Sequence, residues 1–195
     1  MGKPKFFWLG KELKFPFEVS EYEARRKVRS STKYSANGTA FTVFEHSYDE
    51  VKIELDVFSD RDFYHALKAW WAWAKKGKPY GFVLDEDDAV LTALANPAEA
   101  GQSEIKVLST EGITVGGKYK LRSEIEENEE IVKVSGIGEG GTIYLDSPLD
   151  YSYEAGDSFR SVDYYPSVIS LDGEFPAVEK SFGGFEFKHK FREAK

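Results

Sequence analysis

The sequence predicts a mainly β protein of the α+β kind, in which a β-sandwich or barrel carries one packed amphipathic helix and holds a small inserted β-barrel. Three observations lead to this fold class. One segment has the apolar period of a helix, several others alternate with the period of strands, and a glycine-rich stretch contains short strand-like runs at regular spacing. The 195 residues suffice for one large domain or two small ones.

The helix is expected over residues 60–76. Ser59 is a good N-cap, and acidic residues follow in the first turn, where the helix dipole favours negative charge. Apolar residues recur at steps of three and four from Phe63 to Ala74, which gives the helix a face to bury. Gly77 is expected to end it in the left-handed conformation.

The residues on either side of this helix contain strand-like runs, of which the clearest alternates strictly between apolar and charged residues. One other run follows an Asn37-Gly38 turn signal. The runs predicted as strands are 15–19, 39–44, 51–58, 80–85 and 89–94.

The segment 96–164 differs from the rest in charge and in spacing. Between Asn96 and Tyr165 there are 14 acidic and 6 basic residues, so the whole net charge of −8 lies there. Five short strands are expected between glycine-rich or acidic turns, at 105–108, 118–121, 130–134, 142–145 and 158–162. We interpret 96–164 as an acidic small β-barrel inserted into the other domain.

After residue 164 the chain is expected to return to the first domain. Residues 168–171 and 177–180 are interpreted as a hairpin. In the last strand, Phe185, Phe187, His189 and Phe191 share one face, and charged residues share the other. This pattern predicts a core strand, so that residues 1–95 and 165–195 form one discontinuous domain.

The candidates for metal or catalytic chemistry are weak. Asp85, Asp87 and Asp88 lie in an acidic run with the carboxylates that Ca²⁺ and Mg²⁺ prefer as ligands. The spacing of a Ca²⁺ loop is absent, however, and a solvated turn is the favoured interpretation. The chain has no cysteine, which excludes disulfides, thiolate metal sites and cysteine nucleophiles. His65 and His189 are expected to be packed or half-buried. No phosphate loop or nucleophile elbow occurs, so we expect neither an enzyme nor a cofactor.

One basic cluster stands out, formed by Arg25, Arg26, Lys27 and Arg29. Such a cluster can contact nucleic acid, but few aromatic residues accompany it and acidic residues precede it. We therefore favour pairing with an acidic surface of a neighbouring subunit and expect no nucleic acid partner. Trp73 is the tryptophan of the helix most suited to an exposed interface.

The order of these features resembles the core of phage and prophage tail proteins, in particular the distal-tail and tail-tube group. The segments that carry the resemblance are 36–39 with its glycine turn, the alternating run 51–57, the helix 62–71 and the run 80–85. The stretch 151–157 is similar to small β-modules inserted into phage virion proteins. Many distal-tail proteins have a long second domain, and we do not expect one after the last strand here.

The resemblance implies a structural subunit of a phage or prophage tail, without an active site. Such subunits assemble into rings, commonly hexamers, with copies of themselves and with other tail and baseplate proteins. We therefore expect the protein in the virion tail, after assembly in the bacterial cytoplasm. No segment of the sequence is long and apolar enough to suggest a membrane partner. The alternatives are a carbohydrate-binding module that uses exposed aromatic residues and, less favoured, an enzyme of unknown type.

Overall fold

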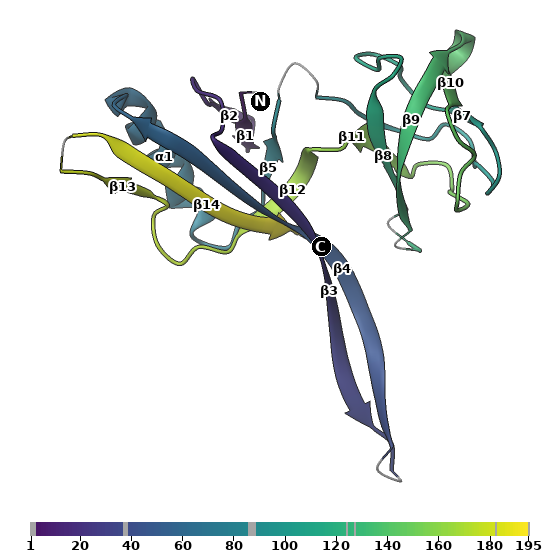
Figure 1. The fold of residues 1–195 in the computed structure, drawn as a ribbon, viewed down its shortest axis with the longest axis horizontal. Helices are drawn as coiled ribbons and strands as arrows, with labels where there is room; N and C mark the ends of the chain where they lie inside the picture. The colour runs from purple at the N-terminus through teal and green to yellow at the C-terminus, as the bar shows by residue number, and fades with distance from the viewer. Residues whose placement is uncertain are drawn as a thin grey trace. The chain divides into compact units, whose positions relative to one another are not determined.

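In a computed structural model, the chain divides into two compact units, residues 1–86 with 165–195 and residues 87–164. Figure 1 shows the ribbon of both units. The structure describes residues 3–36, 39–85, 89–123, 125–126, 128–181 and 183–194, with the backbone alone at positions 41 and 44–46. Most described residues lie in strands and one α-helix is present among them, which confirms the mainly β fold class.

The first unit is built on one large sheet. Its strands run in the order β2-β1-β5-β12-β14-β4-β3, and β13 also pairs with β14. The bounds are β1 Lys5–Trp8, β2 Lys11–Lys14, β3 Glu21–Tyr34, β4 Ala40–Phe58, β5 Tyr80–Val83, β12 Tyr164–Ser170, β13 Ala177–Glu179 and β14 Phe185–Glu193. Pairing is antiparallel wherever the register is defined.

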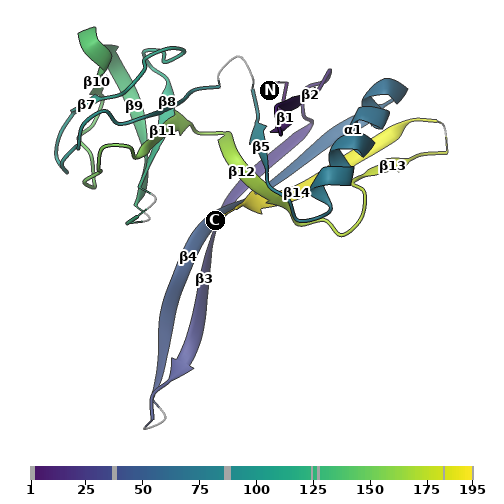
Figure 2. The same cartoon turned by 180° about the vertical axis from the view of Figure 1, so that it is seen from behind.

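The helix α1, Arg61–Ala74, packs on this sheet and lies across β14 (Figure 2). Its N-cap is Asp60 and not Ser59, because an Asp60 side-chain oxygen accepts a hydrogen bond of 2.9 Å from the amide of Phe63. The apolar face is buried as expected, and the ring of Trp70 stacks on Phe6 of β1 with 4.4 Å between ring centroids.

The last strand and the middle of β4 form the centre of the core. The four alternating residues of β14, from Phe185 to Phe191, are buried, as predicted. They pair with β4, and the register shifts between Phe185 and Phe187. This β-bulge places Leu55 and Phe58 of β4 inside, whereas Val57 is exposed, so strict alternation to the end of that strand was wrong.

Two other expectations for the first unit were wrong. Residues 15–19 are not a strand, although Phe15 and Val19 are buried. Their side chains fill the core from an extended connection. The hairpin expected at 168–171 and 177–180 does not form either, because β12 and β13 each pair with β14 and not with each other.

The second unit is a six-stranded sheet with the order β6-β11-β8-β9-β10-β7. Its strands are β6 Leu91–Ala93, β7 Glu104–Lys106, β8 Lys118–Arg122, β9 Glu129–Ile137, β10 Thr142–Leu145 and β11 Ser158–Ser161, and a short 3-10 helix, η1, spans Glu139–Gly141. A bridge between Leu94 and Val107 joins the two ends of this order. The sheet thereby closes into a small barrel around its own apolar cluster.

The boundary between the units lies earlier than expected. The five strands expected within 96–164 are present, but the preceding run pairs with β11 as β6 and thus belongs to the second unit. The second unit is inserted in the chain between β5 and β12, and these two strands are neighbours in the first sheet. Across the described ranges, no helix is long and apolar enough to cross a membrane.

Candidate functional site

The most unusual feature of the first unit is a long two-stranded ribbon. The strands β3 and β4 pair without interruption from Glu21 opposite Glu54 to Tyr34 opposite Ala40, apart from one register shift. By contrast, the pairing of β14 with β4 begins at Glu50, opposite Arg192, and runs to Phe58. Residues 26–34 and 40–49 therefore continue as a hairpin beyond the sheet, which we call the arm (Figure 1).

The arm is exposed along most of β3, where Val28 and Tyr34 leave 62% and 72% of their surface open to solvent. A two-stranded ribbon with no third strand or packed helix is at best marginally stable in water. Its outer edges also carry backbone N–H and C=O groups that can pair with another strand. The arm is thus a surface suited to a partner that adds a strand or covers a face.

The register places the basic cluster on both faces of the ribbon. Arg25, Lys27 and Arg29 alternate with Arg26, so three of the four cations share one face. Arg25 donates from Nε to Oε1 of Glu23 at 2.7 Å and is largely exposed. The structure therefore brings the cluster together as a charged stripe at the start of the arm.

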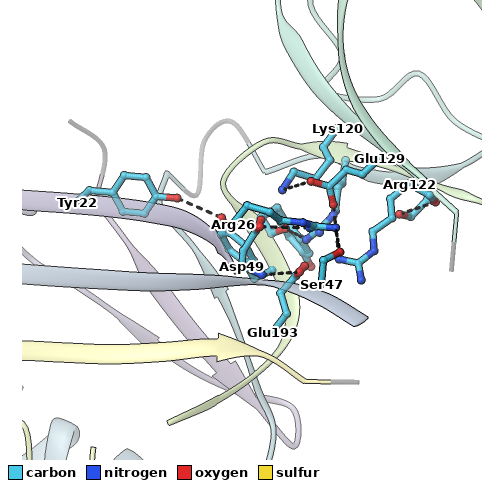
Figure 3. Close-up of polar contacts among 12 residues, drawn as sticks. Tyr22, Arg26, Ser47, Asp49, Lys120, Arg122, Glu129 and Glu193 are labelled. Carbon is cyan, nitrogen blue, oxygen red and sulfur yellow. Dashed lines mark hydrogen bonds and ion pairs between the residues drawn. The ribbon is translucent and has the colours of Figure 1, made fainter. Parts of the chain in front are cut away.

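Arg26 lies on the other face, where it belongs to a network at the base of the arm (Figure 3). Its guanidinium donates to Oδ1 of Asp49 at 3.3 Å and to Oγ of Ser47 at 2.5 Å. Asp49 and Ser47 are both buried, and the amide of Asp49 also donates to a carboxylate oxygen of Glu193 in β14, at 3.3 Å. Arg26 thus joins β3 to β4, and the amide of Asp49 ties β4 to Glu193 of β14.

Trp73 lies on the helix and not on the arm. It is half-buried, and its indole N–H donates to the carbonyl oxygen of Pro79 at 3.0 Å. The ammonium of Lys78 sits over the ring at 4.1 Å from its centroid. These contacts hold Trp73 against the end of its own helix. It is therefore on a different element from the basic cluster, which lies on β3.

The acidic run of the metal hypothesis is only partly described. Asp85 follows β5 and is half-buried, whereas Asp87 and Asp88 lie outside the described residues. In the described part of the chain, no group of three or more histidine, cysteine or acidic side chains is arranged to hold a metal ion.

A buried polar chain crosses the core of the first unit. His189 accepts through Nε2 from the hydroxyl of Tyr80 at 2.6 Å, and its Nδ1 lies 2.5 Å from a carboxylate oxygen of Asp172. Because Asp172 is an acceptor, Nδ1 carries the proton and Nε2 accepts. Asp172 also accepts from the amide of Lys190 at 3.0 Å. The chain joins β5, β14 and the segment after β12.

The environment of this chain sets its charge. Burial lowers the pKa of His189, and Asp172 opposes that effect without reversing it. Burial also holds the pKa of Tyr80 well above its usual range, so the phenol remains a donor. His189 and Tyr80 are both fully buried, which indicates a structural role. The exposed position of His65 shows that the packing expected for it was wrong.

The sequence alone predicted some of the features described above. The basic cluster was evident, and His189 was placed among the phenylalanines of the last strand, but the partners of His189 lie 17 and 109 residues away. Neither the models of known protein families nor the curated proteins include a match to this chain. The arm, its edges and its charges are therefore the features on which a function can be argued.

Proposed function

We propose that the protein is a structural subunit of a phage or prophage tail, which assembles into a ring through strand edges and packed faces. The observation that best supports this proposal is the arm, in which β3 and β4 continue to pair beyond the point where β14 pairs with β4. A ribbon of this kind gains most of its stability when a neighbour supplies further pairing or burial. The tail proteins that the sequence resembles are ring-forming subunits.

In this proposal the arm of one copy docks on the next copy. Residues 40–49 of β4 offer an edge on the side opposite β3, and β3 offers the other edge as the last strand of the sheet. A strand from a neighbour can pair with either edge by β-augmentation. Because the arm and its acceptor are different surfaces, the interface is heterologous, and it forms a ring when the rotation between copies closes.

Charge gives the contact a direction. Residues 25–49 hold five basic and two acidic residues, whereas residues 87–164 hold 16 acidic and 6 basic residues. The arm of one copy and the acidic second unit of another are therefore complementary, which favours encounter in one orientation. Further partners in this proposal are other tail and baseplate proteins, in a virion tail that forms in the bacterial cytoplasm.

Sedimentation velocity over a wide range of protein concentration tests the proposal. We expect a concentration-dependent oligomer, such as the hexamer that the resemblance implies, and we expect it to weaken as salt screens the charge pairs. A variant that replaces residues 29–46 with Asn-Gly shortens the arm and retains the pair of Val28 with Ser47 as the last one. It should remain a folded monomer under the same conditions.

A charge variant separates the arm from general changes in charge. Lys27→Glu with Arg29→Glu should weaken the oligomer, because both residues lie on the arm. Lys75→Ala with Lys76→Ala removes two exposed cations at the end of the helix and should leave it unchanged. A wild-type chain that stays monomeric at the highest concentration, or a shortened arm that assembles normally, would contradict the proposal.

A further inference from the structure

A second surface of interest lies on the outer face of the barrel in the second unit. Tyr144 of β10 stands opposite Glu104 of β7, and Thr142 stands opposite Lys106. These four residues alternate with Ile105 and Ile143, which point into the core. The ring of Tyr144 keeps 44% of its surface open to solvent. An aromatic ring flanked by a carboxylate, an ammonium and a hydroxyl is thus presented on a rigid sheet.

Two glycines of the neighbouring segment leave room for this ring. A Cβ added at Gly136 would come within 3.3 Å of the Tyr144 ring, and one added at Gly138 within 3.2 Å. Gly138 has φ of −103°, which any residue can adopt. The backbone there does not need glycine, whereas the ring needs the space. Tyr144 therefore lies along a strip of backbone that the two glycines leave free of side chains.

A shallow cavity of about 450 Å³ is lined by the residues that flank Tyr144 in the two strands, including Glu104, which stands opposite it. It is lined by the flanking residues Glu104, Lys106 and Thr142 and by polar groups from the loops before β7. The loop residues are Asn96, Pro97, Gln102 and Ser103. Its volume lies within the range of small-ligand sites. The lining supplies both donors and acceptors, next to apolar surface from Pro97 and Ile105.

We propose that this surface binds a neutral saccharide. One pyranose ring would lie with its C–H face on Tyr144, because the face of an aromatic ring carries partial negative charge and attracts the C–H groups of the sugar. Glu104 would accept hydrogen bonds from the sugar hydroxyls, and Lys106 and Thr142 would donate to its oxygens. The next sugar residue would occupy the cavity.

The chemistry of the site argues against other ligands. Residues 87–164 have a net charge of −10, from 16 acidic and 6 basic residues, which repels phosphate backbones and anionic sugars. The charged groups of Glu104 and Lys106 in the lining disfavour a purely apolar ligand, because it would bury them without hydrogen-bond partners. This inference stands on the second unit alone and does not depend on assembly through the arm.

Saturation-transfer NMR on the full chain tests it, with cellotriose, maltotriose and chitotriose as separate probes. We expect transfer to at least one of the three, strongest at the protons of one pyranose face. Tyr144→Phe should retain binding, because the ring is kept. Tyr144→Ala should weaken the affinity about tenfold, since it removes the stacking surface.

Tyr151 provides the matched control, because it is exposed to 45% but lies in a loop outside this face. Tyr151→Ala should bind the active probe as the wild type does. Thermal unfolding by circular dichroism establishes that each variant is folded. Transfer to none of the three probes would overturn the inference. So would a folded Tyr144→Ala variant that binds with unchanged affinity.

Discussion

Lowering the pH from about 8 to about 5 should destabilise the first unit, and His189 should account for the loss. Burial lowers the pKa of His189, so the folded protein keeps this imidazole neutral where the unfolded chain already protonates it. The contribution of neutral His189 to the free energy of unfolding is fully present above about pH 6.5. It is lost as the pH falls from that value through the lower pKa of the folded state.

The structure explains why the folded protein resists this protonation. Tyr80 donates to Nε2, and a protonated Nε2 would have to donate back to the same hydroxyl. Asp172 faces Nδ1 and favours the charged form, but the remaining neighbours are aromatic rings of the core. Each pH unit below about 6.5 costs about 1.4 kcal/mol until the folded pKa is reached, so the loss at about pH 5 is up to about 2 kcal/mol.

Urea unfolding at a series of pH values measures this loss. The variant His46→Gln with His65→Gln keeps His189 as the only histidine and should show the same dependence as the wild type. His189→Phe should be less stable at high pH by about 1–3 kcal/mol, because the hydroxyl of Tyr80 loses its partner. Its stability should then stay level between about pH 8 and pH 5. An equal decline in His189→Phe would refute the reasoning.

Three further predictions concern packing and the division of the chain. Gly81→Ala should destabilise the first unit by about 1–3 kcal/mol in urea unfolding, because the added Cβ would lie 1.9 Å from a phenylalanine ring of β1; a neutral result would contradict the packing. Gly141→Ala combines φ of +85° with a Cβ 2.3 Å from a backbone carbonyl oxygen, whereas Gly116→Ala has φ of +87° and open space. The second variant should lose only about 1 kcal/mol and the first clearly more, and equal losses would count against the close contact. Removal of residues 87–164 with a short glycine-serine linker should leave a folded first unit by NMR, because β5 and β12 are neighbours, and an insoluble product would show that the units depend on each other.

Helices and strands with one buried face were predicted well from the sequence. The helix, the last strand and the barrel strands all follow an apolar period, because burial on one side selects that period. The end of β4 was missed at Val57, since a bulge changes the face without a signal in the residue types. Phe15 was read as part of a strand because an apolar residue in a connection can be buried as deeply as one in a sheet.

The arm was the largest omission of the sequence analysis. Most of β3 is exposed on both faces, so no apolar alternation marks it, and the basic cluster drew attention to charge instead. The turn signal Asn37-Gly38 lies outside the described residues, but β3 on one side of it pairs over its whole length with β4 on the other. The polar chain through His189 was equally beyond sequence reasoning, because its members meet only in the folded core.

Hydrogen exchange of the arm amides, followed by mass spectrometry at low and high protein concentration, tests assembly through the arm most directly. If copies join by its edges, amides of residues 40–49 that exchange quickly in the monomer become protected as the oligomer forms. Amides of β14, which are already paired in the monomer, should not change. An oligomer whose arm amides exchange as fast as those of the monomer would contradict the account.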